Sequence, residues 1–139
     1  MFPEFHLIHR AAQRADQVFS GHYSEVTPRQ FLILVALEKK QGIRQTELTH
    51  LTGIDRSTMT DLIKRLAKRK FIARRRAKAD ARAYAVTLTP AGRHVLEDAS
   101  TAAAATDAAL FSSLTASQRS QLLDMLDTIV KAAEGSSGK

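Results

Sequence analysis

The fold is decided by residues 45–69, which carry the sequence QTELTHLTGIDRSTMTDLIKRLAKR. A short first helix is expected to end at Gly53, because glycine tolerates the left-handed conformation that commonly follows a helix. Asp55 is a typical N-cap residue, so a second helix is predicted to run from it to about Arg69. Two short helices joined by a turn with glycine predict a helix-turn-helix.

The segment after this pair of helices changes its hydrophobic period. Residues 71–76 and 82–88 predict two strands, joined by a polar turn at 77–81. A helix-turn-helix followed by a two-stranded hairpin is the winged helix-turn-helix arrangement. The predicted fold class is therefore mainly α with a small β-hairpin wing.

Helices are predicted on both sides of this core. Capping boxes begin at Thr27 and Thr115, and Thr89 followed by Pro90 starts a long helix. An opening helix is expected to end near Gly21, and the helix after Thr27 is expected to stop at Gly42. We expect a single domain of residues 1–139, with dimerisation helices at 1–22 and 110–139, a winged helix-turn-helix core at 27–89 and a connecting helix at 90–109.

Composition narrows the class of protein. The 139 residues have a net charge of +7 and no cysteine, which excludes disulfides, thiol catalysis, cysteine-type zinc sites and thiol-based redox sensing. No apolar run is long enough to span a membrane and no signal peptide is evident, so a cytoplasmic protein with no membrane partner is expected. Ser-His-Asp groupings, HExxH and glycine-rich phosphate loops are missing too, so we expect no enzyme.

The positive charge is concentrated in one stretch. Residues 56–82 contain eleven cations and two anions, a net +9 that exceeds the charge of the whole chain. Such a cluster attracts polyanions, and on a helix-turn-helix it indicates double-stranded DNA. The alternative of a solvated basic face without a partner is the weaker hypothesis.

Polar residues on the second helix face away from its apolar side, which is marked by Met59, Leu62, Ile63 and Leu66. Near the helix N-terminus, short hydroxyl side chains suit base edges and phosphates, so Ser57, Thr58 and Thr60 are predicted to lie near base edges. Long cations suit the flanking phosphates, which Lys64 and Lys68 are predicted to hold. The residues predicted to contact DNA are Thr46, Arg56, Ser57, Thr58, Thr60, Asp61, Lys64, Arg65 and Lys68, with Arg74, Arg75, Arg76, Lys78, Asp80 and Arg82 in the wing.

Four motifs occur here in a specific order and spacing. They are Gln45-Thr46-Glu47-Leu48, Gly53-Ile54-Asp55-Arg56-Ser57-Thr58, Asp80-Ala81-Arg82 and Leu88-Thr89-Pro90-Ala91-Gly92. In this order they make the chain resemble the MarR family of bacterial transcriptional regulators. The resemblance covers about half of the chain directly, and the flanking helices stand where that family has its dimerisation helices.

The resemblance implies a triangular homodimer with intertwined first and last helices. It also implies recognition helices in successive major grooves of a pseudo-palindromic operator, wings in the flanking minor grooves, and repression relieved by a small anionic, often aromatic, ligand. Asp80 would orient the wing and Arg82 would enter the minor groove. The chain departs from the family at Arg44, where a capping Ser or Thr is common, and at the wing tip, which lacks the usual proline and acidic pair.

The effector site and the dimer seam are the remaining predictions. In the family the ligand lies where the opening helix, the second helix and the DNA-binding part meet. Arg10 would pair with a carboxylate or an acidic thioester tail, or else make an ion pair between subunits. His6 and His9 are three residues apart without a third ligand nearby, so neither a metal nor a cofactor is predicted. Candidate ligand residues are His6, His9, Arg10, Tyr23 and Phe31, and candidate seam residues are Phe2, Phe5, Leu110, Leu114, Leu122, Leu126 and Ile129.

Two rival functions use the same features. A non-specific architectural nucleic-acid binder would use the basic face without an effector. A protein-interaction module would use the winged helix to bind another protein, and the charge of residues 56–82 argues against it. The leading prediction is a ligand-responsive repressor that binds its operator as a homodimer.

Overall fold

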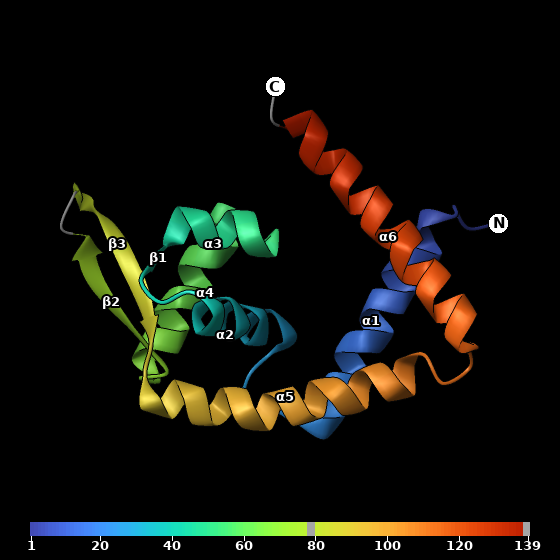
Figure 1. The fold of residues 1–139 in the computed structure, drawn as a ribbon, viewed down its shortest axis with the longest axis horizontal. Coiled ribbons are helices and arrows are strands. Elements are labelled where there is room, and N and C mark those ends of the chain that lie inside the picture. The colour runs from blue at the N-terminus through green and yellow to red at the C-terminus, as the bar shows by residue number, and fades with distance from the viewer. Residues whose placement is uncertain (78–79, 138–139) are drawn as a thin grey trace.

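Six helices and one small sheet make up the part of the chain that the structure, a computed structural model, describes (Figure 1). It describes the backbone of residues 1–77 and 80–137 and the side chains of residues 1–76 and 84–134. In chain order the elements are α1 (Phe5–His22), α2 (Pro28–Lys39), β1 (Ile43–Arg44), α3 (Gln45–Thr52), α4 (Arg56–Lys68), β2 (Ile72–Ala77), β3 (Asp80–Leu88), α5 (Pro90–Leu110) and α6 (Ala116–Ser137). The predicted fold class, mainly helical with a winged helix-turn-helix, is confirmed.

Helix ends follow the local capping rules at most of the predicted places. The hydroxyl of Thr27 accepts from the Gln30 backbone N–H at 3.2 Å, and the Gln30 side chain accepts from the Thr27 N–H at 3.0 Å. Gly53 ends α3 with a positive φ of 73°, as predicted. α1 ends at His22, next to the predicted end near Gly21. The predicted end of α2 was too late, because the helix stops at Lys39, before the turn that contains Gly42.

The sheet has three antiparallel strands in the order β1-β3-β2, not the two that were predicted. β1 was not predicted, because a strand of two residues has no hydrophobic period to recognise. In β1, Ile43 pairs with Val86 of β3, and both side chains are buried. β3 begins at Asp80, two residues earlier than predicted, and the β2–β3 register shifts after Arg76. The predicted turn at 77–81 was therefore too long.

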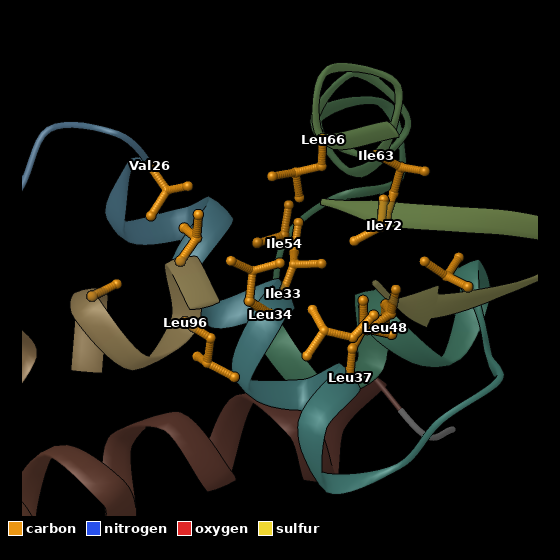
Figure 2. Packing of buried hydrophobic residues seen from close by; sticks show 14 of the residues in the cluster. Val26, Ile33, Leu34, Leu37, Leu48, Ile54, Ile63, Leu66, Ile72 and Leu96 are labelled. Atoms are coloured by element: carbon orange, nitrogen blue, oxygen red, sulfur yellow. The ribbon is translucent and has the colours of Figure 1, made fainter. Parts of the chain in front are cut away.

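The hydrophobic core lies within the winged helix and is centred on α2 (Figure 2). Ile33, Leu34 and Leu37 of α2 are fully buried, and they meet side chains from α3, α4, the sheet and α5. The residues from these other elements include Leu48, Met59, Ile63, Leu66, Ile72, Val86 and Leu96. This core fixes the orientation of α3 and α4 relative to the hairpin.

The start of α5 is fastened to the turn that follows α4. The Thr89 hydroxyl donates to the Lys70 carbonyl at 2.7 Å and accepts from the Gly92 N–H at 3.0 Å, while the Thr89 N–H donates to the Phe71 carbonyl at 3.1 Å. A Cβ on Gly92 would lie 2.0 Å from the Phe71 carbonyl oxygen. The close approach of these backbones is possible only because residue 92 has no side chain.

The terminal helices α1 and α6 lie away from the sheet. In Figure 1, α5 runs along one edge of the molecule. The winged helix lies at its N-terminal end, and α1 and α6 lie towards its C-terminal end. α1 packs against α5, but Phe19 is its only buried residue. None of the described side chains of α6, residues 116–134, is buried. Within the described residues, no helix is both long enough and apolar enough to cross a membrane.

Candidate nucleic-acid interface

The second helix of the helix-turn-helix, α4, separates its side chains by face. Met59, Ile63 and Leu66 are fully buried against the core. Most of the residues predicted to contact DNA lie on the exposed side: Arg56, Ser57, Asp61, Lys64, Arg65 and Lys68 are exposed, and Thr58 and Thr60 are half-buried. The structure thus places all eight of the predicted α4 residues away from the buried stripe. Thr46, in the first turn of α3, is also exposed.

Hydroxyl groups surround the carboxylate at the start of α4. Asp55 occupies the N-cap position with extended backbone, and it accepts a hydrogen bond from the Ser57 hydroxyl at 3.1 Å. Hydrogen bonding from the Thr58 side chain, with a smaller contribution from Ser57, lowers the pKa of the Asp55 carboxyl. Without DNA, Asp55 therefore binds two of the three hydroxyls that were predicted to approach base edges, those of Ser57 and Thr58. Arg44, the N-cap of α3, makes no capping hydrogen bond from its side chain, as its departure from the family pattern implied.

The hydroxyl of Thr60 has two protein partners. It donates to the Arg56 carbonyl at 3.0 Å and accepts from the Gln45 side-chain amide at 2.8 Å. Gln45 was not among the predicted site residues. It lines a hollow of about 190 Å³ between α3 and α4, together with Thr46, Thr49, Arg56 and Thr60. Sequence patterns place Gln45 at a helix start, but they cannot show that its amide reaches a residue fifteen positions later.

The cations that follow differ in their partners. Arg65 forms an exposed ion pair with Asp61 at 3.0 Å, whereas Lys64 and Lys68 form no ion pair with any described residue. Arg69 serves a structural purpose instead. Its guanidinium donates to the Glu25 carbonyl, lies 3.9 Å from the Glu25 carboxylate and stacks 4.6 Å from the Phe71 ring centre. It fastens the end of α4 to the α1–α2 connection.

The wing adds a second group of cations. Arg74, Arg75 and Arg76 of β2 are exposed, and the Arg74 guanidinium lies 5.7 Å from the ring centre of Tyr84 on β3. Asp80 and Arg82 belong to the first part of β3, but their side chains fall outside the described ones. Lys78 lies outside the described residues altogether. The backbone places both residues in β3, which begins two residues before the predicted strand, and their proposed roles stay predictions.

The predicted ligand residues fall into two separate groups within one chain. His6, His9 and Arg10 lie in the first half of α1, where Phe2 stacks on His6 at 4.5 Å between ring centres. Tyr23 follows α1, and Phe31 of α2 packs against Phe19 at 5.6 Å. Partial burial raises the pKa of the Tyr23 hydroxyl, and the nearby carboxylates of Glu25 and Asp98 raise it further. Tyr23 comes thirteen positions after Arg10, which corresponds to about 20 Å along a helix.

Large apolar side chains are exposed on α1 and α6. On the N-terminal side, Phe2 is 77% exposed and Phe5 is 59% exposed. On α6, Ile129 is 58% exposed. The other predicted seam residues, Leu110, Leu114, Leu122 and Leu126, are half-buried. A folded protein rarely leaves such an apolar surface in water.

Comparisons with known proteins agree with this geometry. The MarR family pattern matches residues 26–84. The regulator SarZ of Staphylococcus haemolyticus is 31% identical over 71 residues, which make up 51% of this chain and about half, 48%, of that relative. BpsR of Bordetella bronchiseptica, whose DNA binding is regulated by 6-hydroxynicotinic acid, is 31% identical with a TM-score of 0.83 over 90% of this chain and 96% of that one.

A second solved structure adds to this agreement. The transcriptional regulator PcaV of Streptomyces coelicolor, in complex with its natural ligand, has a TM-score of 0.89 at 26% identity, covering 94% of this chain and 93% of that one. Sequence motifs, the three-stranded winged helix and the flanking helices therefore lead to one assignment. The chain belongs to the MarR family and has the winged helix-turn-helix fold of that family.

Proposed function

We propose that this chain is a ligand-responsive transcriptional repressor that binds a pseudo-palindromic operator as a homodimer. The observation that carries the proposal is the exposed face of α4, beside the arginines of β2. This face presents hydroxyls at its start and, further along, lysines that form no ion pair with any described side chain. A helix of this kind fits the major groove, where short side chains approach base edges and lysines approach phosphates. The similarity to SarZ and BpsR supports the same function.

Two residues on α4 allow a direct test of the proposal. Alanine at Lys64 removes a phosphate contact, so it should weaken binding to the DNA upstream of the protein's own gene and to random DNA alike, and lower the salt slope by about 1 per site. Alanine at Thr58 should instead reduce the difference in affinity between the two DNAs, because a lost base contact weakens binding only to the specific sequence.

Titrations of both variants against both DNAs at two salt concentrations measure these effects. Alanine at Lys39, an exposed lysine at the end of α2, is the control with the same change in net charge. Identical behaviour of the Lys64 and Thr58 variants on both DNAs would show that the faces of α4 are assigned wrongly. If the unmodified protein binds its own upstream DNA less than about 10³ times more tightly than random DNA, the architectural alternative is favoured.

The effector is proposed to be a small organic acid or its coenzyme A thioester, with an aromatic group. The regulation of BpsR by 6-hydroxynicotinic acid supports this class of molecule, and the ligand complex of PcaV supports a ligand site in a similar fold. Arg10 is the proposed partner of the carboxylate, because a guanidinium stays charged and binds carboxylates through two parallel hydrogen bonds. Since about 20 Å of helix separates Arg10 from Tyr23, a pocket that contains both groups would need α1 of a second copy.

Removing the Arg10 charge is expected to separate the effector response from DNA binding. Arg10→Ala should leave operator affinity largely unchanged and weaken the response to 6-hydroxynicotinic acid by about tenfold, the scale of one lost charged hydrogen bond. Because coupling between sites is reciprocal, operator DNA should weaken binding of the acid by the same factor that the acid weakens DNA binding. Arg14→Ala, one turn further along α1, is the matched control. An unchanged response in the Arg10 variant would leave Arg10 without this role.

A further inference from the structure

The hydrogen bond between Gln45 and Thr60 is the only side-chain hydrogen bond that joins α3 to α4 among the described residues. The Gln45 amide belongs to the first residue of α3, and Thr60 lies one turn into α4. Both side chains are half-buried, so water competes with this 2.8 Å contact less than it would on an open surface.

The Thr60 hydroxyl has little capacity left for DNA. A threonine hydroxyl offers one proton and two lone pairs. The proton is donated to the Arg56 carbonyl and one lone pair accepts from Gln45. A base edge that needs a hydrogen-bond donor from Thr60 would have to break the contact with Arg56.

The contact lies between two residues that were predicted to bind DNA. Thr46 follows Gln45 in α3, and Arg56 is the first residue of α4; both line the hollow that Gln45 and Thr60 also line. Leu48 of α3 and Met59 of α4 are both buried in the hydrophobic core, but apolar contact has no preferred direction and tolerates small shifts. A hydrogen bond restricts both distance and angle.

We propose that Gln45 and Thr60 are positioning residues, which fix α3 against α4 so that Thr46 and Arg56 meet the DNA backbone together, and that Thr60 makes no base contact of its own. This inference rests on the proposed DNA-binding function. It replaces the sequence-based interpretation of Thr60 as a residue near base edges.

The test is a double-mutant cycle on DNA binding. Thr60→Val keeps the shape and branching of the side chain but removes the hydroxyl, and Gln45→Met keeps the length but removes the amide. Each should reduce affinity for the protein's own upstream DNA by about tenfold, since both DNA-binding parts of a dimer lose one hydrogen bond. Affinity for random DNA should fall by a similar factor, because Thr46 and Arg56 are proposed to contact the DNA backbone, which is the same in every sequence. The melting temperature should fall by no more than a few degrees, about what one hydrogen bond contributes. The double variant should bind no more weakly than either single variant.

Two further variants make the outcome decisive. Thr60→Ser retains the hydroxyl and should restore the affinity, whereas combining Gln45→Met with Thr58→Val should give additive losses, because Thr58 does not share the hydrogen bond. The side-chain amide resonances of Gln45 should shift in Thr60→Val without DNA, which checks the contact itself. Additive losses for the Gln45 and Thr60 variants, or unchanged affinity in Thr60→Val, would overturn the inference. If the unmodified protein fails to distinguish its own upstream DNA from random DNA, the proposed function fails instead.

Discussion

Alanine in place of Gly92 is expected to lower the free energy of unfolding by about 3 kcal/mol, the upper part of the usual range for added volume in a packed site. The new Cβ would lie 2.0 Å from the Phe71 carbonyl oxygen and 2.9 Å from a methyl group of Leu88. A backbone carbonyl cannot move aside as a flexible side chain can, so α5 must shift away from the turn after α4. Thermal unfolding at fixed protein concentration should show a melting temperature lower by roughly 10 °C.

Gly21 provides the matched control for this substitution. It also lies within a helix, but a Cβ there would meet nothing within 4 Å. Gly21→Ala should therefore be neutral or should stabilise by up to about 1 kcal/mol, because alanine favours helix more than glycine does. Equal melting temperatures for the two variants would show that α5 does not approach Phe71 as closely as described.

Aspartate in place of Ile129 is expected to abolish the proposed dimer and, with it, most of the specific DNA binding. Ile129 is 58% exposed in the single chain, so a charged side chain there costs the folding of one protomer little. Buried between two copies, the same carboxylate would be desolvated without a partner. Light scattering should change from the mass of two chains to that of one, 15.3 kDa. Affinity for the operator should fall by at least about 100-fold, because two half-sites no longer bind as one unit.

The control for this variant is Ser120→Asp on the same helix. Nine residues separate the two positions, which is two and a half turns, so they lie on opposite faces of α6. Ser120→Asp should remain dimeric and bind DNA normally. An Ile129→Asp protein that keeps the dimer mass would place the seam elsewhere.

Much of the helix-turn-helix could be predicted because its signals are local. The apolar stripe of α4 repeats every three or four residues, and it predicted the burial of Met59, Ile63 and Leu66. Leu62, the fourth residue of that predicted face, is only half-buried. Capping at Thr27 and the left-handed Gly53 depend on residues within one turn of each other. For these features, neighbouring residues alone determine the conformation.

Contacts between distant residues could not be predicted in this way. β1 exists because Ile43 pairs with Val86, and Arg69 leaves the basic face because the Glu25 carbonyl is within its reach. The wing begins earlier than expected because the register shift after Arg76 depends on both strands. The Gln45–Thr60 contact likewise depends on how α3 crosses α4.

The candidate effector residues show a third limit. His6, His9 and Arg10 were grouped with Tyr23 and Phe31 because the resemblance places α1 and α2 at one site. Along a continuous helix, however, distance grows by 1.5 Å per residue. The grouping therefore requires a second chain, which the sequence of one chain does not describe.

Because the start of α5 is bound to the turn after α4 through Thr89 and Gly92, this helix could transmit movement between its two ends as a rigid body. α5 has 21 residues and is about 30 Å long. If α5 turned by about 5° about its C-terminal end, where α1 and α6 lie, its N-terminal end at Thr89 would move by roughly 2.6 Å. Since Thr89 holds the carbonyls of Lys70 and Phe71, the turn after α4 is carried along with it. A small rotation among the terminal helices would thereby become a translation of α4, the helix proposed to contact DNA.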